Sequence, residues 1–271
     1  MKWTGLFLCL TLLVAFFLMI PPDDAAAETY ESFIRLHPHG PPGEGMKGDE
    51  KEKEKEKEHV YYTSPTNEVI SAGVWEAAPR TGGPNTLEYS EFMYILEGSV
   101  TLVDAQGQKQ TFKAGEAVLA PRGVEIIWQQ TEPVRKYWVI FDVTPAEGEQ
   151  RPSSVIRVDP SVELKGEGRG KEHMYYAAKA DEERINAGVW EAQPQASPPA
   201  DFFTPDSSEF VYILEGSVTL EDKSGKKDTF KAGDAFIIPR GISVKWIQPG
   251  HLKEFWLYFD PVPKAGTGKS E

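Results

Sequence analysis

Two glutamates, Glu91 and Glu209, stand at matching places in a chain that repeats itself, and each precedes a short apolar and aromatic run that ends in Glu-Gly. A carboxylate that points into an apolar interior is costly in its charged form. It must be protonated, accept hydrogen bonds from Tyr or Trp, or pair with a cation, for which the aligned Arg135 and Lys253 are candidates. In any of these states it can anchor a ligand hydroxyl or amine.

A structural role for the two glutamates is the alternative interpretation, because many buried polar groups only satisfy hydrogen bonds of the fold. The residues just before the two glutamates differ: residues 84–87 read Pro-Asn-Thr-Leu, whereas residues 202–205 read Phe-Phe-Thr-Pro. We therefore expect only one of the two copies to bind a ligand.

Tryptophans form the second group of residues with chemical potential. Strand alternation places Trp128 on the face of Ile126, and Trp246 on the face of Val244. One interpretation is core packing, since aromatic residues dominate β cores. The other is a stacking wall for a sugar or a planar metabolite.

The elements that position these residues occur twice. Order and spacing are kept between the copies, apart from a small length change before Glu91 and Glu209. A repeat of this length is a duplicated domain rather than a solenoid unit. The matching segments are Ala72–Ala77 with Ala187–Ala192, Glu97–Leu102 with Glu215–Leu220, Phe112–Gly115 with Phe230–Gly233, and Pro121–Gly123 with Pro239–Gly241.

Each copy is predicted to be all-β. Short runs rich in β-forming residues are separated by Gly- and Pro-containing turns, as at residues 92–96 and 100–103. Outside the first residues, no long segment has the 3.6-residue period of a helix. Strands at this spacing form a sandwich or a closed barrel.

These motifs resemble the cupin superfamily, whose fold is a double-stranded β-helix or jelly roll. The first cupin motif ends in Glu, an aromatic-aliphatic strand and Glu-Gly, as in Glu91–Gly98 and Glu209–Gly216. The second is Gly, a spacer and Pro-x-Gly, as in Gly115–Gly123 and Gly233–Gly241. The chain is similar to the branch that contains ureidoglycine aminohydrolase and an ethanolamine-utilisation protein. The resemblance implies two tandem cupin barrels, a bicupin.

The resemblance also implies a metal site, but the chain lacks its histidines. Metal-binding cupins use His-x-His before the motif Glu and a further His after Pro-x-Gly, where Ile126 and Val244 stand here. One carboxylate does not hold a transition metal against water. Trp128 and Trp246, on the same faces, then fill or line the former metal cavity. His59 and His173 lack a second ligand at useful spacing. We therefore predict no metal and no other cofactor.

Composition narrows the partners. The formal net charge of -13 disfavours nucleic acid and anionic membranes. The only cysteine, Cys9, lies in an apolar N-terminal run, so disulfides and thiolate chemistry are not expected in a processed chain.

The N-terminus has the pattern of a secretory signal. Lys2 precedes an apolar run from Trp3 to Ile20, and Ala25–Ala27 supply small residues for cleavage. We predict export to the periplasm or beyond, with an uncleaved anchor as the alternative. The predicted organisation is signal peptide 1–27, disordered linker 28–58, cupin domain 59–145, connection 146–172, cupin domain 173–262 and disordered tail 263–271.

Three functions remain open. The leading hypothesis is a metal-free bicupin that binds a small polar metabolite such as a sugar or a carboxylate. The second is an aminohydrolase- or isomerase-like enzyme, for which Tyr94 and Tyr212 are the available acid–base groups and catalytic residues are otherwise unknown. The third is an assembly module without a ligand. The sequence leaves homodimer formation open.

Overall fold

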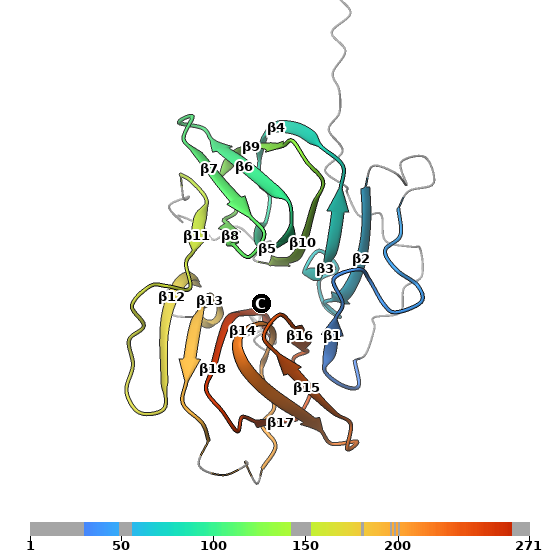
Figure 1. Ribbon diagram of the computed structural model, residues 1–271, viewed down its shortest axis with the longest axis vertical. Helices are drawn as coiled ribbons and strands as arrows, with labels where there is room; N and C mark the ends of the chain where they lie inside the picture. Colours follow the sequence, from blue (N-terminus) through green and yellow to red (C-terminus); the bar gives the residue numbers. More distant parts are fainter. Residues whose placement is uncertain are drawn as a thin grey trace, which may run out of the picture.

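The computed structural model describes residues 30–48, 56–141, 153–179, 182–195, 197, 199 and 201–261, and these residues form strands and turns but no helix. Figure 1 shows two barrels packed against each other, the first in teal to green and the second in orange to red. The described part of the chain therefore confirms the predicted all-β fold. It contains no helix that is long and apolar enough to span a bilayer.

The first barrel consists of two sheets. The six-stranded sheet has the order β11-β8-β5-β10-β3-β2 and the four-stranded sheet has the order β4-β9-β6-β7. Their strands are β2 (Glu56–Thr63), β3 (Ser71–Ala77), β4 (Arg80–Thr86), β5 (Ser90–Glu97), β6 (Ser99–Asp104), β7 (Lys109–Lys113), β8 (Ala117–Ala120), β9 (Glu125–Gln130), β10 (Val134–Phe141) and β11 (Ile156–Val158).

The second barrel repeats this arrangement, with β14 spanning the counterparts of both β5 and β6. One sheet path is β1-β16-β14-β18-β13-β12, and β14 continues to pair with β15 and β17. The strands are β1 (Ile34–Leu36), β12 (Gly170–Lys179), β13 (Glu182–Ala192), β14 (Ser207–Asp222), β15 (Lys227–Lys231), β16 (Ala235–Ile238), β17 (Val244–Ile247) and β18 (Leu252–Pro261).

The barrels exchange their outermost strands. β1 precedes the first barrel in the chain but pairs with β16 of the second, whereas β11 follows the first barrel and pairs back with its β8. Arg35 on β1 forms hydrogen bonds with Asp228 at 2.8 and 2.9 Å and lies over the ring of Phe230. Arg157 on β11 ion-pairs with Glu116 at 2.8 Å and lies over the ring of Phe112, and the first of these contacts corresponds to the ion pair of Arg35 with Asp234 at 3.2 Å.

This exchange corrects two domain predictions. Where the structure describes them, residues 28–58 are not a solvated spacer, and the connection 146–172 is not a simple link, because each contains a strand that completes a barrel. The buried side chains of Leu36 and Val158 anchor these strands in the core. The predicted signal peptide and C-terminal tail lie outside the described residues.

The two faces of each large sheet have different surroundings. Along β5, Met93 and Ile95 face the interior of the first barrel, whereas Phe92 and Tyr94 face the second barrel. β14 repeats this pattern, with Phe210 directed at the first barrel. Because both faces are buried, these strands are almost continuously apolar instead of alternating with polar residues.

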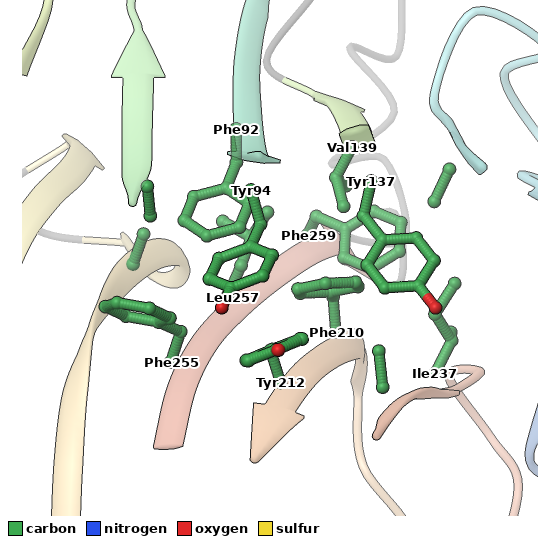
Figure 2. Close-up of a cluster of buried hydrophobic side chains, with 14 of the residues drawn as sticks. Phe92, Tyr94, Tyr137, Val139, Phe210, Tyr212, Ile237, Phe255, Leu257 and Phe259 are labelled. Carbon is green, nitrogen blue, oxygen red and sulfur yellow. The ribbon is translucent and has the colours of Figure 1, made fainter. Parts of the chain in front are cut away.

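The shared face joins the barrels through one aromatic core. Figure 2 shows rings from both barrels interleaved there, and the rings of Phe92 and Phe210 lie 5.7 Å apart. At the edge of this core, buried Asp260 accepts hydrogen bonds from Tyr62, from Ser64 at 2.8 Å and from Arg240 at 3.1 Å. Tyr62 and Ser64 belong to the first barrel and Asp260 and Arg240 to the second, so this polar cluster ties the two barrels together. The two barrels therefore pack into one unit.

Candidate functional site: two barrel interiors with opposite charge patterns

In the first barrel, the motif glutamate forms a buried ion pair. The Lys136 ammonium donates to Glu91 Oε1 at 2.6 Å, and the two residues are 8% and 9% exposed. Glu91 is the second residue of β5, and Lys136 lies near the start of the antiparallel neighbour β10, opposite Ile95. The long lysine side chain therefore runs diagonally across the interior to reach the carboxylate, which neutralises the charge that burial would otherwise penalise.

Two tryptophans surround the same ammonium group. Lys136 Nζ lies 5.1 Å from the ring centroid of Trp75 and 4.9 Å from that of Trp128, and the two rings meet edge to face at 6.0 Å. A cation over an aromatic face is stabilised by the ring quadrupole, by about 2 kcal/mol or more when the cation is desolvated. Glu91, Trp75 and Trp128 together form a binding set for an ammonium ion, and here the chain supplies that ion itself.

A second carboxylate, that of Glu58, lies near this ion pair. Burial and the negative charge of Glu56 raise the pKa of Glu58, while the positive charge of Lys136 acts in the opposite direction. Glu56 in turn accepts from Trp75 Nε1 at 2.6 Å and pairs with Arg80 at 2.9 Å. The polar groups of the first barrel are thus connected to one another.

In the second barrel, the corresponding positions carry two acids. Glu209 matches Glu91, but Glu254 stands where the first barrel has Lys136, and the side chains of both are buried. Burial raises the pKa of Glu209 to about 7, although a hydrogen bond with Tyr258 lowers it. Burial and the neighbouring charge of Glu209 raise the pKa of Glu254 well above the usual range. Oε2 of Glu254 has no hydrogen-bond partner among the described residues.

The tryptophan pair is retained in the second barrel. Trp190 and Trp246 meet edge to face at 6.4 Å, close to the 6.0 Å separation of Trp75 and Trp128. Trp128 Nε1 donates to Gln130 at 2.6 Å. The matching acceptor, Gln248 Oε1, is engaged instead by Arg169 at 2.8 Å, and Trp246 Nε1 has no partner within the described part of the chain.

Of the predicted site residues, four point into the barrels: Glu91, Glu209, Trp128 and Trp246. The basic candidates do not. Arg135 pairs with Glu76 and Glu97, each at 2.5 Å, and Lys253 lies 3.8 Å from Glu191. Arg135 and Lys253 directly precede Lys136 and Glu254, which do face the interiors. Because side chains alternate along β10 and β18, the two basic residues lie on the opposite face.

The predicted tyrosines also lie elsewhere. Tyr94 and Tyr212 stack on each other across the inter-barrel core, with ring centroids 3.8 Å apart (Figure 2). Burial raises the pKa of both hydroxyl groups. They therefore belong to the packing of the two barrels and are not acid–base groups beside Glu91 or Glu209.

The sequence reasoning missed Lys136 and Glu254, the residues that distinguish the two interiors. A signal was present: in the aligned copies, Arg135-Lys136 matches Lys253-Glu254, so the second position reverses its charge. That position also shares a strand face with Trp138 or Trp256.

The residues at the cupin metal position do not fit a transition metal. Ile126 and Val244, at the expected histidine positions, are buried apolar side chains, and Glu91 is already paired with Lys136. Within the described ranges, no group of three or more His, Cys, Asp and Glu side chains could hold a metal ion.

Two jelly-roll barrels with one motif carboxylate each define the class: a bicupin that carries an ion pair in one interior and a pair of acids in the other, in place of the histidine set. The chain belongs to the EutQ-like cupin domain family, whose model matches residues 65–138 and 179–248. No curated protein sequence matches it.

Solved structures share the architecture over most of the chain. A protein of unknown function from Pseudomonas syringae pv. tomato is 18% identical, with TM-score 0.68, covering 84% of this chain and all of that one (100%). A putative glyoxylate-induced protein from Pseudomonas aeruginosa is 17% identical, with TM-score 0.58, covering 88% and 92%. Protein Ylba from E. coli is 13% identical, with TM-score 0.57, covering 87% and 94%. At these identities the similarity establishes the fold.

Proposed function

We propose that this chain is an exported bicupin that binds a small polar ligand inside its second barrel. The observation that carries the proposal is the difference between the interiors. Glu91 is neutralised by Lys136 at 2.6 Å, whereas the described residues place no cation against Glu209 or Glu254. Buried polar groups without partners are rare in proteins and are a common mark of a binding site.

The absence of a cation beside Glu209 and Glu254 among the described residues also favours a sugar over a carboxylate as the ligand. A ligand carboxylate would add a third acid beside Glu209 and Glu254, and like charges in an apolar interior repel strongly. Hydroxyl or amine groups can instead donate hydrogen bonds to both side chains.

The test is a thermal-shift screen of neutral sugars, polyols, amines and carboxylates against the purified chain, because a ligand of the native state raises the melting temperature by mass action. Glu209→Gln should abolish the shift from any hit, and Glu91→Gln, its matched control in the first barrel, should retain it. Retention in both variants, or loss in Glu91→Gln alone, would contradict a site in the second barrel.

The export part of the proposal is supported by residues 1–27, whose sequence is that of a cleavable signal. Intact mass of the natively expressed protein provides the test, with Glu28 as the expected first residue. A mass that still includes Met1 to Ala27 would support the membrane anchor.

A further inference from the structure

We infer that the ligand of the second barrel is an organic ammonium ion, bound between Glu209 and Glu254 and the edge-to-face pair of Trp190 and Trp246. The inference rests on the proposed function and adds the chemical class of the ligand. It is carried by the comparison of the two interiors, because one of them already holds an ammonium group.

The first barrel shows what the set of residues recognises. The Lys136 ammonium is held by one carboxylate at 2.6 Å and by two indole rings at 4.9 and 5.1 Å. A carboxylate combined with aromatic ring faces selects an ammonium ion. The carboxylate attracts the positive charge and accepts its hydrogen bonds, and the ring faces stabilise the cation in place of water.

The second barrel keeps each part of this set except the internal cation. Glu209 begins the same stretch of strand as Glu91, and Trp190 and Trp246 repeat the ring geometry at 6.4 Å and 81° against 6.0 Å and 84°. Glu254 replaces the lysine, so the chain no longer supplies the ammonium and gains a second acceptor. Oε2 of that acceptor is buried and has no partner in the described part of the chain.

Nearby charges do not fill this position. Lys245 precedes Trp246 on β17, so it points to the opposite face, and its ammonium lies 4.6 Å from the ring of Phe202. Arg169 is held by Gln248 at 2.8 Å and contacts Trp190 at 5.7 Å from the ring.

The tryptophan pair of the second barrel is also the more exposed of the two pairs. Trp75 and Trp128 are 6% and 9% exposed, while Trp190 and Trp246 remain partly exposed. Solvent therefore reaches part of each tryptophan of the second barrel, whereas both tryptophans of the first barrel are buried.

The experiment uses n-propylammonium as the probe, with 1-propanol, propionate and sodium chloride as matched comparators. Isothermal titration and thermal shift at pH 8 should show saturable binding of n-propylammonium alone. Affinity should fall by about tenfold or more in Glu254→Gln, where one charged acceptor is lost. It should vanish in Glu254→Lys, because the new lysine can reach Glu209 as Lys136 reaches Glu91.

A second variant tests the recognition set independently of the second barrel. Lys136→Ala removes the internal ammonium and leaves Glu91, Trp75 and Trp128 in place. We expect n-propylammonium, but not 1-propanol, to restore part of its lost thermal stability and to titrate with two sites instead of one. This variant also shows that the assay detects such a site where one has been opened.

Rescue of Lys136→Ala without binding to the unaltered chain would overturn the inference. So would stabilisation by calcium or manganese ions in place of amines. If neutral polyols bind in a Glu209-dependent way and amines do not, the proposed ligand site stands and the ammonium assignment falls. If neither the amines nor the sugars and polyols of the thermal-shift screen bind, both fall.

Discussion

The two barrels of this chain share strands, motifs and tryptophan pairs, and they differ in the residue that accompanies the buried motif glutamate. In the first barrel, Lys136 forms an ion pair with Glu91. In the second barrel, Glu254 takes the position of the lysine and lies near Glu209. The first interior is a completed ion pair, and the second is a pair of acids whose pKa values burial raises. One charge reversal can thus leave a fold unchanged and alter the electrostatics of its interior.

The largest expected effect concerns the completed pair. Lys136→Met leaves Glu91 buried without its cation, and breaking a buried pair in this way costs about 3–5 kcal/mol. The matched variant in the second barrel, Glu254→Met, removes an unpaired acid and should be neutral or stabilising at pH 8. Urea unfolding of both variants measures the difference. Equal losses of stability would show that the two interiors do not differ as described.

The pH dependence of stability should separate the interiors next. The unfolded chain loses the Glu209 proton near the ordinary glutamate pKa of 4.5, but the folded chain keeps it until about pH 7. The folded state therefore binds more protons in this window, and the free energy of unfolding falls as the pH rises through it, by about 3 kcal/mol for Glu209. The titratable groups around Glu209 are Glu254 and Tyr258, and Glu172 acts on Tyr258 in turn.

Glu254→Lys should remove this pH dependence, because a lysine paired with Glu209 favours the charged carboxylate. Urea midpoints measured from pH 5 to pH 8 provide the comparison with the unaltered chain. A slope in the variant that matches the unaltered chain would assign the dependence to other groups.

The smallest expected effect concerns the indole nitrogens. Trp128→Phe removes the 2.6 Å hydrogen bond to Gln130 and should cost about 1–2 kcal/mol. Trp246→Phe removes a nitrogen that has no partner within the described residues and should cost less, or stabilise. Thermal unfolding of the two variants gives the comparison, and a greater loss for Trp246→Phe would reveal a partner of that nitrogen.

Some features of the candidate site could be predicted and others could not. Strand alternation from Ile126 and Val244 correctly placed Trp128 and Trp246 in the interiors. Strand alternation counted from Glu91 also predicts that Tyr94, three residues later, lies on the opposite face of the strand, outside the barrel interior. The burial of both sheet faces hid this, because Phe92, Met93 and Tyr94 are all apolar or aromatic and hydropathy does not distinguish their faces.

The choice of Arg135 over Lys136 failed for a related reason. A shift of one residue exchanges the faces of a strand, and the pairing of β10 with β5 is irregular between Arg135 and Lys136. Two adjacent basic residues at a strand start therefore cannot be assigned to a face from their order alone.

The sequence by itself determined the duplication, the all-β class, the cupin barrels and the two interior glutamates, because repeats, turn residues and strand periodicity are local properties of the chain. It even contained the exchanged strands, since Ile34-Arg35-Leu36 recurs as Ile156-Arg157-Val158. Only the tertiary structure decided which barrel each of these strands completes and that Lys136, 45 residues from Glu91, is its partner. Both depend on which strands become neighbours in the folded chain, and no local sequence pattern specifies the neighbours of a strand that is distant in sequence.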